Sequence, residues 1–491
     1  MNSARRLAFA PLLASVALAL SGCGSGSSQP AAIPSFGGRF AHHSGGTTPI
    51  QHIIIVMQEN RSFNNLFYGF PGAKTAKFGN GHGSQYKVKK VDLAYYFDLN
   101  HSHSQFLEDY DQGKDDGWDS EILPQPANDP KCQGKGNNPY YQNEPSCWVI
   151  SKNPVDKQRA FSYVDHTEIT PYWTMAEEYA LGDETFSSNN GPTFVSHQYL
   201  VAGQSGHSVE VPNGQPWGCN ANSSVTVNLL AYGPADPPVF SPATGHEVAG
   251  PSPCFSYPTI AAALDGAGLT WRYYAQKADS GRDLEPFEAN KPIWDGADRA
   301  NIISPDTKVL SDITSGNLAN VSWVTPSGLK SDHPGRQSGD GGPDWVASIV
   351  NAVGNSQYWD STAIIIMWDE WGGWFDPVHP PQYADPQTGA REGLGFRVPL
   401  IVVSPYAKAG YVSHDQHEIA STLRFIEETF GLGTIGSCTD KKTQYADCRA
   451  DGFDDMFDYT QSPIPFVTIP PVKHGARYFL NLHDDTPGDT Y

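Results

Sequence analysis

Two strongly apolar segments of the chain, residues 53–57 and 363–368, end abruptly in polar side chains. The polar residues that follow these segments are Glu59, Asn60, Asp369 and Glu370. Short runs rich in β-branched residues favour strands buried on both faces, and open α/β sheets bind ligands at the carboxyl ends of such strands. The oxygen donors suit a divalent cation, Mg²⁺, Ca²⁺ or Mn²⁺ more than softer ions, although Zn²⁺ stays open. We therefore predict a metal site made from both strand ends.

Two simpler interpretations of these acids remain open. Glu59 would also fit a solvated loop, and Asp369 or Glu370 would also fit the cap of a turn at Gly372–Gly373. Adjacent carboxylates at the end of a buried strand repel each other unless a positive group lies beside them. Two acid-ended strands in one chain therefore favour the metal site.

Thr193 is the candidate nucleophile. It follows the turn sequence Asn189-Asn190-Gly191-Pro192 and precedes a segment with helical character. At a helix N-terminus the free amides and the dipole favour a phosphate or a developing alkoxide, and metal coordination activates a hydroxyl further. A threonine in this place also commonly caps the helix, so a capping role stays open.

Alternating strand and helix signals predict the elements that position these residues. Strands are expected at 52–58, 269–274, 321–324, 363–368 and 398–404, and helices at 170–182, 260–266, 344–353 and 418–430. This alternation predicts an α/β fold with a mostly parallel central sheet. Residues 70–160 and 205–256 are rich in turn-forming residues and are expected to be long irregular insertions. We expect residues 49–491 to form a single domain.

The N-terminus predicts export. Arg5-Arg6 and the apolar residues 7–20 form a signal peptide over 1–22, and Leu20-Ser21-Gly22-Cys23 resembles the lipobox of bacterial lipoproteins. That resemblance implies lipidation of Cys23, a flexible tether over 23–48, and a membrane-anchored protein in the periplasm or on the cell surface. An ordinary secretory signal is the alternative.

Six further cysteines fit an exported protein with disulfides. Because they lie in three pairs close in sequence, we expect the bonds Cys132–Cys147, Cys219–Cys254 and Cys438–Cys448. The formal net charge of −21, spread along the chain, argues against nucleic acid as a partner and against simple electrostatic attraction to anionic membranes.

The motifs together resemble the bacterial phosphoesterase family of phospholipases C and acid phosphatases. The motifs, in family order, are Glu59-Asn60-Arg61-Ser62-Phe63, Gly191-Pro192-Thr193, Ser331-Asp332-His333-Pro334, Trp368-Asp369-Glu370-Trp371-Gly372-Gly373, Arg397-Val398-Pro399-Leu400 and Leu423-Arg424-Phe425-Ile426-Glu427. The resemblance spans about residues 50–432. It implies the alkaline-phosphatase-like three-layer α/β/α fold.

The resemblance also implies roles for individual residues. Glu59, Asn60, Asp369 and Glu370 would bind the metal, and Thr193 would touch it as the nucleophile that forms a phospho-threonine. His101 and His333 would bind phosphate oxygens or protonate the leaving group, with Asp332 supporting His333. The implied substrate is a phosphoester, either a phospholipid or a small monoester. A non-catalytic, ligand-binding lipoprotein on the same scaffold is the alternative.

The chain departs from the family pattern in three places. Asn64 replaces an acid, Pro377 replaces a histidine with His379 two residues later, and Val195-Ser196 replace Pro-Asn after the nucleophile. We expect the first two departures to bear on the substrate rather than on the fold.

Overall fold

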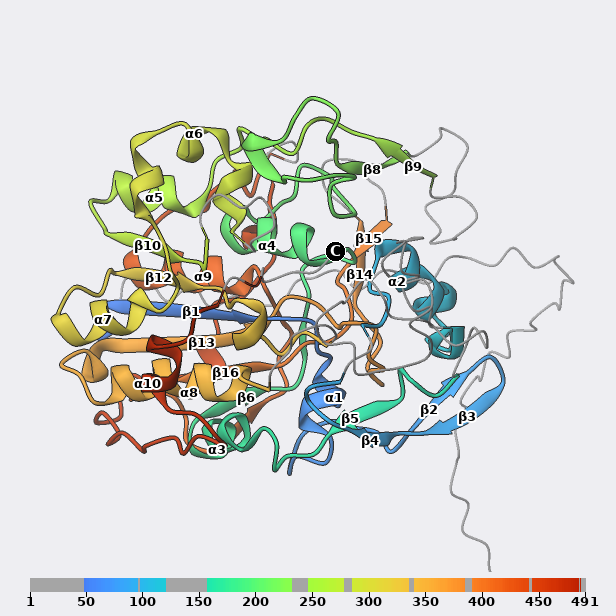
Figure 1. Cartoon of the computed structure of the whole chain (residues 1–491), viewed down its shortest axis with the longest axis horizontal. Coiled ribbons are helices and arrows are strands. Elements are labelled where there is room, and N and C mark those ends of the chain that lie inside the picture. The colour runs from blue at the N-terminus through green and yellow to red at the C-terminus, as the bar shows by residue number, and fades with distance from the viewer. Residues whose placement is uncertain are drawn as a thin grey trace, which may run out of the picture. The chain divides into compact units, whose positions relative to one another are not determined.

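A central sheet of eight strands forms the core of the structure (Figure 1). Strand β1 (His52–Gln58) lies in its middle, and the segment Ile53–Met57 is buried, as a strand covered on both faces requires. The strands run in the order β11, β10, β12, β1, β13, β16, β6 and β17. Within this sheet the described strands pair in parallel, except that β16 is antiparallel to β13 and β6. The predicted α/β fold with a mostly parallel sheet is confirmed.

The other sheet strands are β6 (Ala180–Gly182), β10 (Trp271–Tyr274), β11 (Ile302–Ile303), β12 (Val321–Val324), β13 (Thr362–Trp368), β16 (Leu400–Val403) and β17 (Tyr411–Ser413). Five two-stranded pairs lie outside the sheet: β2 (Phe78–Gly81) with β3 (Ser84–Lys87), β4 (Lys89–Val91) with β5 (Ser162–Val164), β7 (Thr185–Phe186) with β18 (His417–Glu418), β8 (Asn228–Ala231) with β9 (His246–Ala249), and β14 (Gln382–Ala384) with β15 (Arg391–Gly393).

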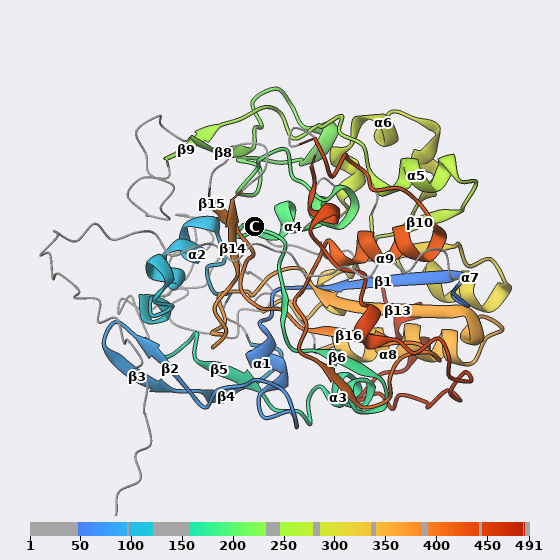
Figure 2. The same cartoon turned by 180° about the vertical axis from the view of Figure 1, so that it is seen from behind.

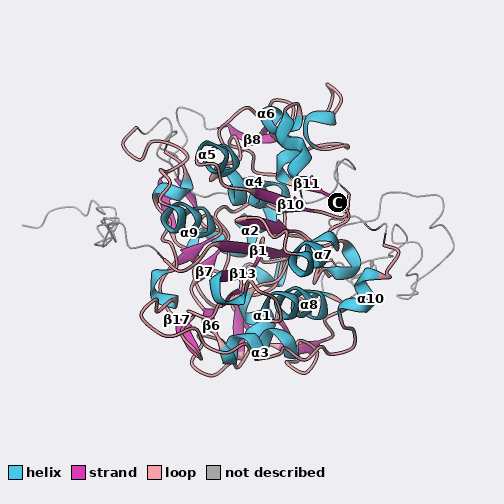
Figure 3. Cartoon of the chain, turned by 90° about the vertical axis from the view of Figure 1, so that its left-hand side faces the viewer, coloured by secondary structure: helices cyan, strands magenta, loops and turns pink. Residues whose placement is uncertain are grey.

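Helices cover both faces of the sheet (Figure 3). On one face α4 (Thr193–Ala202) contacts α5 (Ile260–Gly266) and α9 (Ser421–Phe430). On the other face α8 (Gly342–Gly354) contacts α3 (Thr170–Glu178), α7 (Lys308–Ser315) and α10 (Ala476–Leu480). The remaining helices are α1 (Phe63–Phe67), α2 (His103–Tyr110) and α6 (Lys291–Trp294). The three layers agree with the α/β/α sandwich expected from the sequence.

The computed structural model describes residues 48–95, 98–120, 157–231, 246–277, 285–334, 340–384, 391–440, 444–484 and 486. Residues 47–491 group as one compact unit. The expected disulfides Cys219–Cys254 and Cys438–Cys448 are present. The signal peptide, the tether, Cys23 and the Cys132–Cys147 pair lie outside the described residues. Among the described helices, none combines the length and the apolarity that a bilayer crossing needs.

Two expectations about the elements need correction. The helix predicted over 170–182 ends at Glu178, because Tyr179 leaves the helical region with φ −127° and ψ −134°, and the apolar residues that follow form β6. The regions 70–160 and 205–256 are not wholly irregular, since the described part of the first holds β2, β3, β4 and α2 and that of the second holds β8 and β9. In Figures 1 and 2 the β2–β3 hairpin extends beyond the carboxyl ends of β1 and β13.

Candidate active site

The register of the two central strands brings the predicted metal ligands together. β1 and β13 are parallel neighbours, and Gln58 pairs with Trp368 at their carboxyl ends. The next residues of both strands therefore emerge side by side. All four predicted ligands, Glu59, Asn60, Asp369 and Glu370, are fully buried. The interpretation of Glu59 as a solvated loop acid is wrong.

Backbone geometry at Asn60 connects the two strand ends directly. Asn60 has a φ of 56°, unusual for a residue with a side chain, and its amide N–H donates to Asp369 Oδ1 at 3.0 Å. The Asn60 side-chain nitrogen lies 2.9 Å from His101 Nε2. Its Oδ1 is buried and has no hydrogen-bond partner in the part of the chain that the structure describes. A buried carbonyl oxygen of this kind is a suitable ligand for a hard cation.

His197 joins this group, although the sequence did not mark it as a ligand. Its Nε2 lies 3.2 Å from Glu59 Oε1, and ligand atoms of Glu59, His197 and Asp369 all lie within 4.8 Å of one another. His197 is one helical turn after Thr193 on α4, so both side chains lie on the same helix face. The four-residue spacing from the nucleophile was the available signal in the sequence. A lone histidine in an apolar helix looks the same as an ordinary core residue.

Glu370 has a double role. One of its oxygens, Oε2, accepts the Gly372 N–H at 2.7 Å, so the turn-cap interpretation is correct for that oxygen. The other, Oε1, lies 3.9 Å from His101 Nε2. The capped turn requires glycine, because Gly372 has a φ of +63° and a Cβ there would lie 2.1 Å from the Asn60 carbonyl oxygen. The turn therefore holds Glu370 against the end of β1.

Thr193 occupies the first position of α4 rather than the N-cap, which is Pro192. Its side chain is fully buried, and Oγ1 has no hydrogen-bond partner among the described residues. An unsatisfied buried hydroxyl costs free energy, on the order of 1–3 kcal/mol, and natural proteins retain few of them. The capping alternative for Thr193 is therefore excluded, and its hydroxyl is available for chemistry.

A small cavity of about 20 Å³ lies next to Thr193, the predicted nucleophile. The residues that line it are Thr193, Phe194, His197, Gln198, Trp217, Gly218, Glu285, Pro286, Glu288 and Ala289. Its wall combines the aromatic side chains of Phe194 and Trp217 with the carboxylates of Glu285 and Glu288. The Glu285 carboxylate also accepts the backbone amides of Phe287 and Glu288. A group bound there would meet a face that is both aromatic and acidic.

The two predicted histidines lie side by side, with ring centroids 5.7 Å apart. With Asp98 they form a second group whose ligand atoms lie within 4.8 Å of one another. His101 Nδ1 lies 2.7 Å from the Leu99 carbonyl oxygen, which assigns the hydrogen to Nδ1 and leaves Nε2 as the acceptor from Asn60. Burial, followed by the charge of His333, lowers the pKa of His101 to about 3, so the ring is neutral.

Asp332 has partners other than the one predicted. Its Oδ2 accepts the Tyr172 hydroxyl at 2.8 Å and the Trp368 Nε1–H at 3.0 Å. His333 Nδ1 instead lies 2.5 Å from the Pro334 carbonyl oxygen. The prediction that the Asp332 carboxylate supports His333 is therefore wrong. Burial raises the pKa of Asp332 to about 6, and this residue belongs to the framework under the site.

Arg61 fastens the loop of Asp332 and His333 to the end of β1. This guanidinium is fully buried, with Nε donating to the Asp332 carbonyl at 2.8 Å and the Nη atoms to Asn65 and Leu93. Gln58 adds two bonds, one to the Lys330 carbonyl and one from the Asp332 amide, both at 3.1 Å. Arg61, the arginine of the Glu-Asn-Arg motif, therefore has a structural role.

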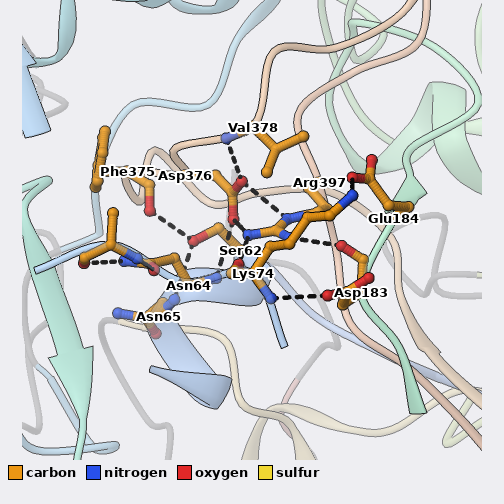
Figure 4. Close-up of polar contacts among 11 residues, drawn as sticks. Ser62, Asn64, Asn65, Lys74, Asp183, Glu184, Phe375, Asp376, Val378 and Arg397 are labelled. Carbon is orange, nitrogen blue, oxygen red and sulfur yellow. Dashed lines mark hydrogen bonds and ion pairs between the residues drawn. The ribbon is translucent and has the colours of Figure 1, made fainter. Parts of the chain in front are cut away.

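The departure at Asn64 also belongs to the framework (Figure 4). The Asn64 amide donates to Asp376 Oδ2 at 2.9 Å, and its side-chain oxygen accepts the Ala76 amide at 2.9 Å. Arg397 Nε donates to the other oxygen of Asp376 at 2.9 Å, and Arg397 Nη1 and Nη2 donate to the carbonyls of Asp183 and Lys74. The described contacts of Asn64 thus connect two loops and include none of the predicted metal ligands.

The other departures lie away from the strand ends. Pro377 is exposed, and His379 is half-exposed with its Nδ1 2.7 Å from Asp115, so His379 does not replace the absent histidine. Ser196 Oγ lies 3.1 Å from Ser187 Oγ and accepts from Asn189, both of which precede α4. These contacts fasten α4 to the preceding loop.

The donor set fits a divalent cation. Glu59, His197 and Asp369 offer ligand atoms within 4.8 Å of one another, and the fully buried Glu370 follows Asp369 with its Oε1 3.9 Å from His101 Nε2. Removing several like charges from water is costly unless a cation or protons neutralise them. The buried oxygens of Asn60 and Thr193, which lack partners among the described residues, are the further donors that such an ion needs.

Comparisons with known proteins identify the family of the chain. The phosphoesterase family model matches residues 50–433. A non-hemolytic phospholipase C of Pseudomonas aeruginosa is 25% identical over 444 residues, which are 79% of this chain and 55% of that protein. Phospholipase C A of Mycobacterium tuberculosis is 28% identical over 429 residues, which are 79% of this chain and 74% of that protein.

The chain spans about half the length of the Pseudomonas relative. Among solved structures, a Vibrio parahaemolyticus protein of the alkaline phosphatase superfamily matches at a TM-score of 0.35 and 9% identity, over 83% of this chain and 70% of that one. That likeness is too weak to add to the family assignment. The family match covers well over half of the chain and every strand-end residue of the site. The chain belongs to the phosphoesterase family.

Proposed function

We propose that the chain is a metal-dependent hydrolase of phosphoric esters with Thr193 as its nucleophile. The observation that carries this proposal is the buried Thr193 hydroxyl, which has no hydrogen-bond partner among the described residues and lies one helical turn from His197. His197 contacts Glu59, which lies beside Asp369 at the ends of the two central strands. The relatives named phospholipase C support the class of reaction.

Glu59, Asn60, Asp369 and Glu370 would hold the cation together with Thr193, and the structure adds His197 to this set. When bound, a divalent cation supplies positive charge that lowers the pKa of the threonine hydroxyl and offsets the charge of the phosphoryl oxygens. The N-terminus of α4 adds the positive end of a helix dipole at the same place.

The reaction has two steps. Thr193 Oγ1 releases its proton to solvent water and bonds to phosphorus, while the bond from phosphorus to the leaving oxygen breaks. Water then attacks the same phosphorus, the Oγ1–phosphorus bond breaks, and Oγ1 regains a proton. We assign protonation of the leaving oxygen to His333, because His101 Nε2 already accepts from Asn60 and His101 Nδ1–H is directed at Leu99. His101 therefore orients Asn60.

The cavity beside Thr193 favours a phosphodiester over a bare monoester. Trp217 offers an aromatic face, and Glu285 and Glu288 offer negative charge, which together suit a cationic head group such as that of phosphocholine. Phosphate alone would meet electrostatic repulsion from the two acids. We therefore propose a phospholipase C type of activity, with an acid-phosphatase type as the competing possibility.

We further propose that the protein is exported and held at a membrane through lipid on Cys23. The support is the signal-like residues 1–22 and the Leu-Ser-Gly-Cys sequence, together with the two disulfides of the described part, which are typical of oxidising compartments. Mass spectrometry of the protein purified from membranes tests this proposal, because a diacylglyceryl adduct on an N-terminal Cys23 is expected. A mature chain that begins elsewhere, without lipid, would contradict it.

A substrate panel tests the enzymatic proposal. Release of phosphocholine from phosphatidylcholine and of phosphate from small monoesters is measured for the wild type and Thr193→Ala, with and without a chelator. The wild type is expected to favour the diester, to lose activity with the chelator, and to lose on the order of 10⁴-fold or more through Thr193→Ala. Full activity in Thr193→Ala would overturn the mechanism, and inactivity of the folded, metal-loaded wild type on every substrate would favour the non-catalytic alternative.

A further inference from the structure

One segment of this acidic chain is strongly basic. Residues 73–91 contain no Asp or Glu, although the chain as a whole has a formal charge of −21. The lysines of this segment are Lys74, Lys77, Lys87, Lys89 and Lys90. The segment includes the β2–β3 hairpin and strand β4. Such a local reversal of charge needs a physical reason.

Two of the five lysines have partners inside the protein. Lys74 pairs with Glu184, and Lys90 lies 3.3 Å from Asp165 and 3.7 Å from Glu168. The other three, Lys77, Lys87 and Lys89, are exposed and make no ion pair with any described residue. The acid under the hairpin tip, Asp119, is itself occupied by His82 and Lys157. Three positive charges are therefore available to a partner.

An exposed aromatic side chain lies among these charges. Phe78 is 50% exposed, and it pairs across the hairpin with Lys87. Directly paired residues of two strands project from the same face, so the ring and the ammonium group share the outer face. The strand alternates, with Gly79 and Gly81 buried and Phe78 and Asn80 exposed. Lys77 precedes Phe78 and Lys89 follows the hairpin, and both are exposed. We call Lys77, Phe78, Lys87 and Lys89 the basic-aromatic patch.

The inner face of the hairpin packs on Phe375, which follows the turn at the end of β13. A side chain at Gly79 would lie 2.6 Å from the rings of Phe161 and Phe375, so the hairpin backbone packs directly on both. Phe375 follows the Asp369–Gly373 turn, and its carbonyl accepts from Ser62 Oγ at 3.1 Å. Figures 1 and 2 show the hairpin beyond the carboxyl ends of the central strands.

We propose that the basic-aromatic patch is a docking surface for an anionic lipid bilayer. The proposal rests on the proposed phospholipid substrate, because an enzyme that removes a lipid head group must meet the bilayer. Three lysines without an ion pair among the described residues complement anionic head groups, and a half-exposed phenylalanine suits the interface between head groups and acyl chains. This local surface amends the expectation that the acidic chain has no electrostatic attraction to membranes.

The net negative charge does not prevent this contact. At physiological ionic strength charges separated by more than about 8 Å are largely screened, so the charges nearest the bilayer dominate. Each lysine at an anionic surface contributes about 1 kcal/mol, which is roughly a fivefold change in partitioning. Loss of all three unpaired lysines is therefore expected to weaken vesicle binding on the order of a hundredfold.

Vesicle co-sedimentation tests the proposal without turnover. The full chain carries Cys23→Ser and Thr193→Ala in every sample, so neither lipidation nor hydrolysis contributes. Vesicles are made of phosphatidylcholine, with or without phosphatidylglycerol. The variants are Phe78→Ser and the triple change Lys77→Gln, Lys87→Gln and Lys89→Gln. Matched controls are Leu480→Ser and Lys308→Gln, which alter an exposed apolar residue and an exposed lysine elsewhere.

The reference chain, which carries only Cys23→Ser and Thr193→Ala, is expected to bind the anionic vesicles more tightly than the neutral ones. This binding is expected to weaken as the salt concentration rises. The triple lysine variant loses this preference, Phe78→Ser weakens binding to both vesicle types, and the controls keep both properties. Equal binding by patch variants and reference chain, or equal binding to both vesicle types, would overturn the proposal. With Thr193 restored, patch variants are expected to keep wild-type activity on a small soluble phosphoester. Absence of that activity in the wild type would contradict the proposed function and leave the binding result valid.

Discussion

At the scale of single residues, the site depends on buried acidic side chains at the ends of β1 and β13, where only part of their oxygens serve the turn and the strand ends. The carboxylates of Glu59, Asp369 and Glu370 were predictable, because each follows an apolar run that has no need of an acid. For His197 the sequence offered only its four-residue spacing from Thr193, which was too weak a signal, since a histidine inside an apolar helix resembles any core residue until the fold brings Glu59 to it. The sequence also could not show that the Asp332 carboxylate binds Tyr172 and Trp368, which are far from it in the chain.

His197 provides the prediction at this scale. His197→Gln is expected to weaken metal binding at least about tenfold and to lower kcat accordingly, because the imidazole nitrogen beside Glu59 is lost. Metal affinity is measured by calorimetric titration of the chelator-treated protein. His166→Gln is the matched control, since the His166 side chain is 61% exposed. Unchanged metal affinity in His197→Gln would remove His197 from the site.

At the scale of elements, the buried strands were the most predictable part of the fold. β1 and β12 have the predicted bounds, because uninterrupted β-branched and aromatic runs specify strands buried on both faces. Strand β6 was missed because Tyr179-Ala180-Leu181 continues the apolar pattern of α3, and only its pairing with β16 and β17 makes it a strand. The antiparallel direction of β16 depends on tertiary contacts that no local pattern encodes.

The turn after β13 offers a test at this scale. Gly372→Ala is expected to lower the free energy of unfolding by roughly 1–3 kcal/mol and to reduce metal affinity, because the residue has a positive φ and a Cβ would meet the Asn60 carbonyl. Chemical denaturation and metal titration measure the two effects. Gly433→Ala is the control, since a Cβ at Gly433 meets nothing within 4 Å. Equal losses of stability and of metal affinity in Gly372→Ala and Gly433→Ala would contradict the role of the turn.

Glu427 on helix α9 makes the stability of the fold depend on pH, independently of the active site. Burial first, and the neighbouring charge of Asp447 second, raise the pKa of Glu427 from 4.5 to about 9. Below pH 4.5 the carboxyl is protonated in both folded and unfolded chains. Between pH 4.5 and about 9 the folded protein keeps a proton that the unfolded chain has released. The free energy of unfolding therefore falls as pH rises, by up to about 1.4 kcal/mol per pH unit.

Glu427→Gln removes this titration and keeps a group that can donate to Asp447. We expect the variant to match the wild type near pH 4.5 and to be more stable at pH 8, as measured by denaturant unfolding at both pH values. Glu177→Gln, at an exposed position, is expected to follow the wild type at both. If the stability of Glu427→Gln fell with pH as steeply as that of the wild type, Glu427 would not be the group that keeps the proton in the folded protein.

At the scale of the whole molecule, the fold brings together residues that lie far apart in the chain. Parallel pairing of β1 with β13 joins the two halves of the metal site, which are about 310 residues apart in sequence. Helix α4 and the loop of His333 come from intervening segments. The sequence predicted the class of fold and both strand ends, because these follow from local patterns. The cavity beside Thr193 was not predictable, since Trp217, Glu285 and Glu288 meet only in the folded chain.

The central claim is that Thr193 takes up the phosphoryl group during turnover. The most direct measurement is mass spectrometry of the metal-loaded enzyme, quenched with acid while it turns over a phosphomonoester or phosphatidylcholine. We predict an added phosphoryl or phosphocholine group on the peptide that contains Thr193, present in the wild type and absent from Thr193→Ala. An active enzyme that carries the adduct on another residue, or that turns over equally well as Thr193→Ala, would contradict the account.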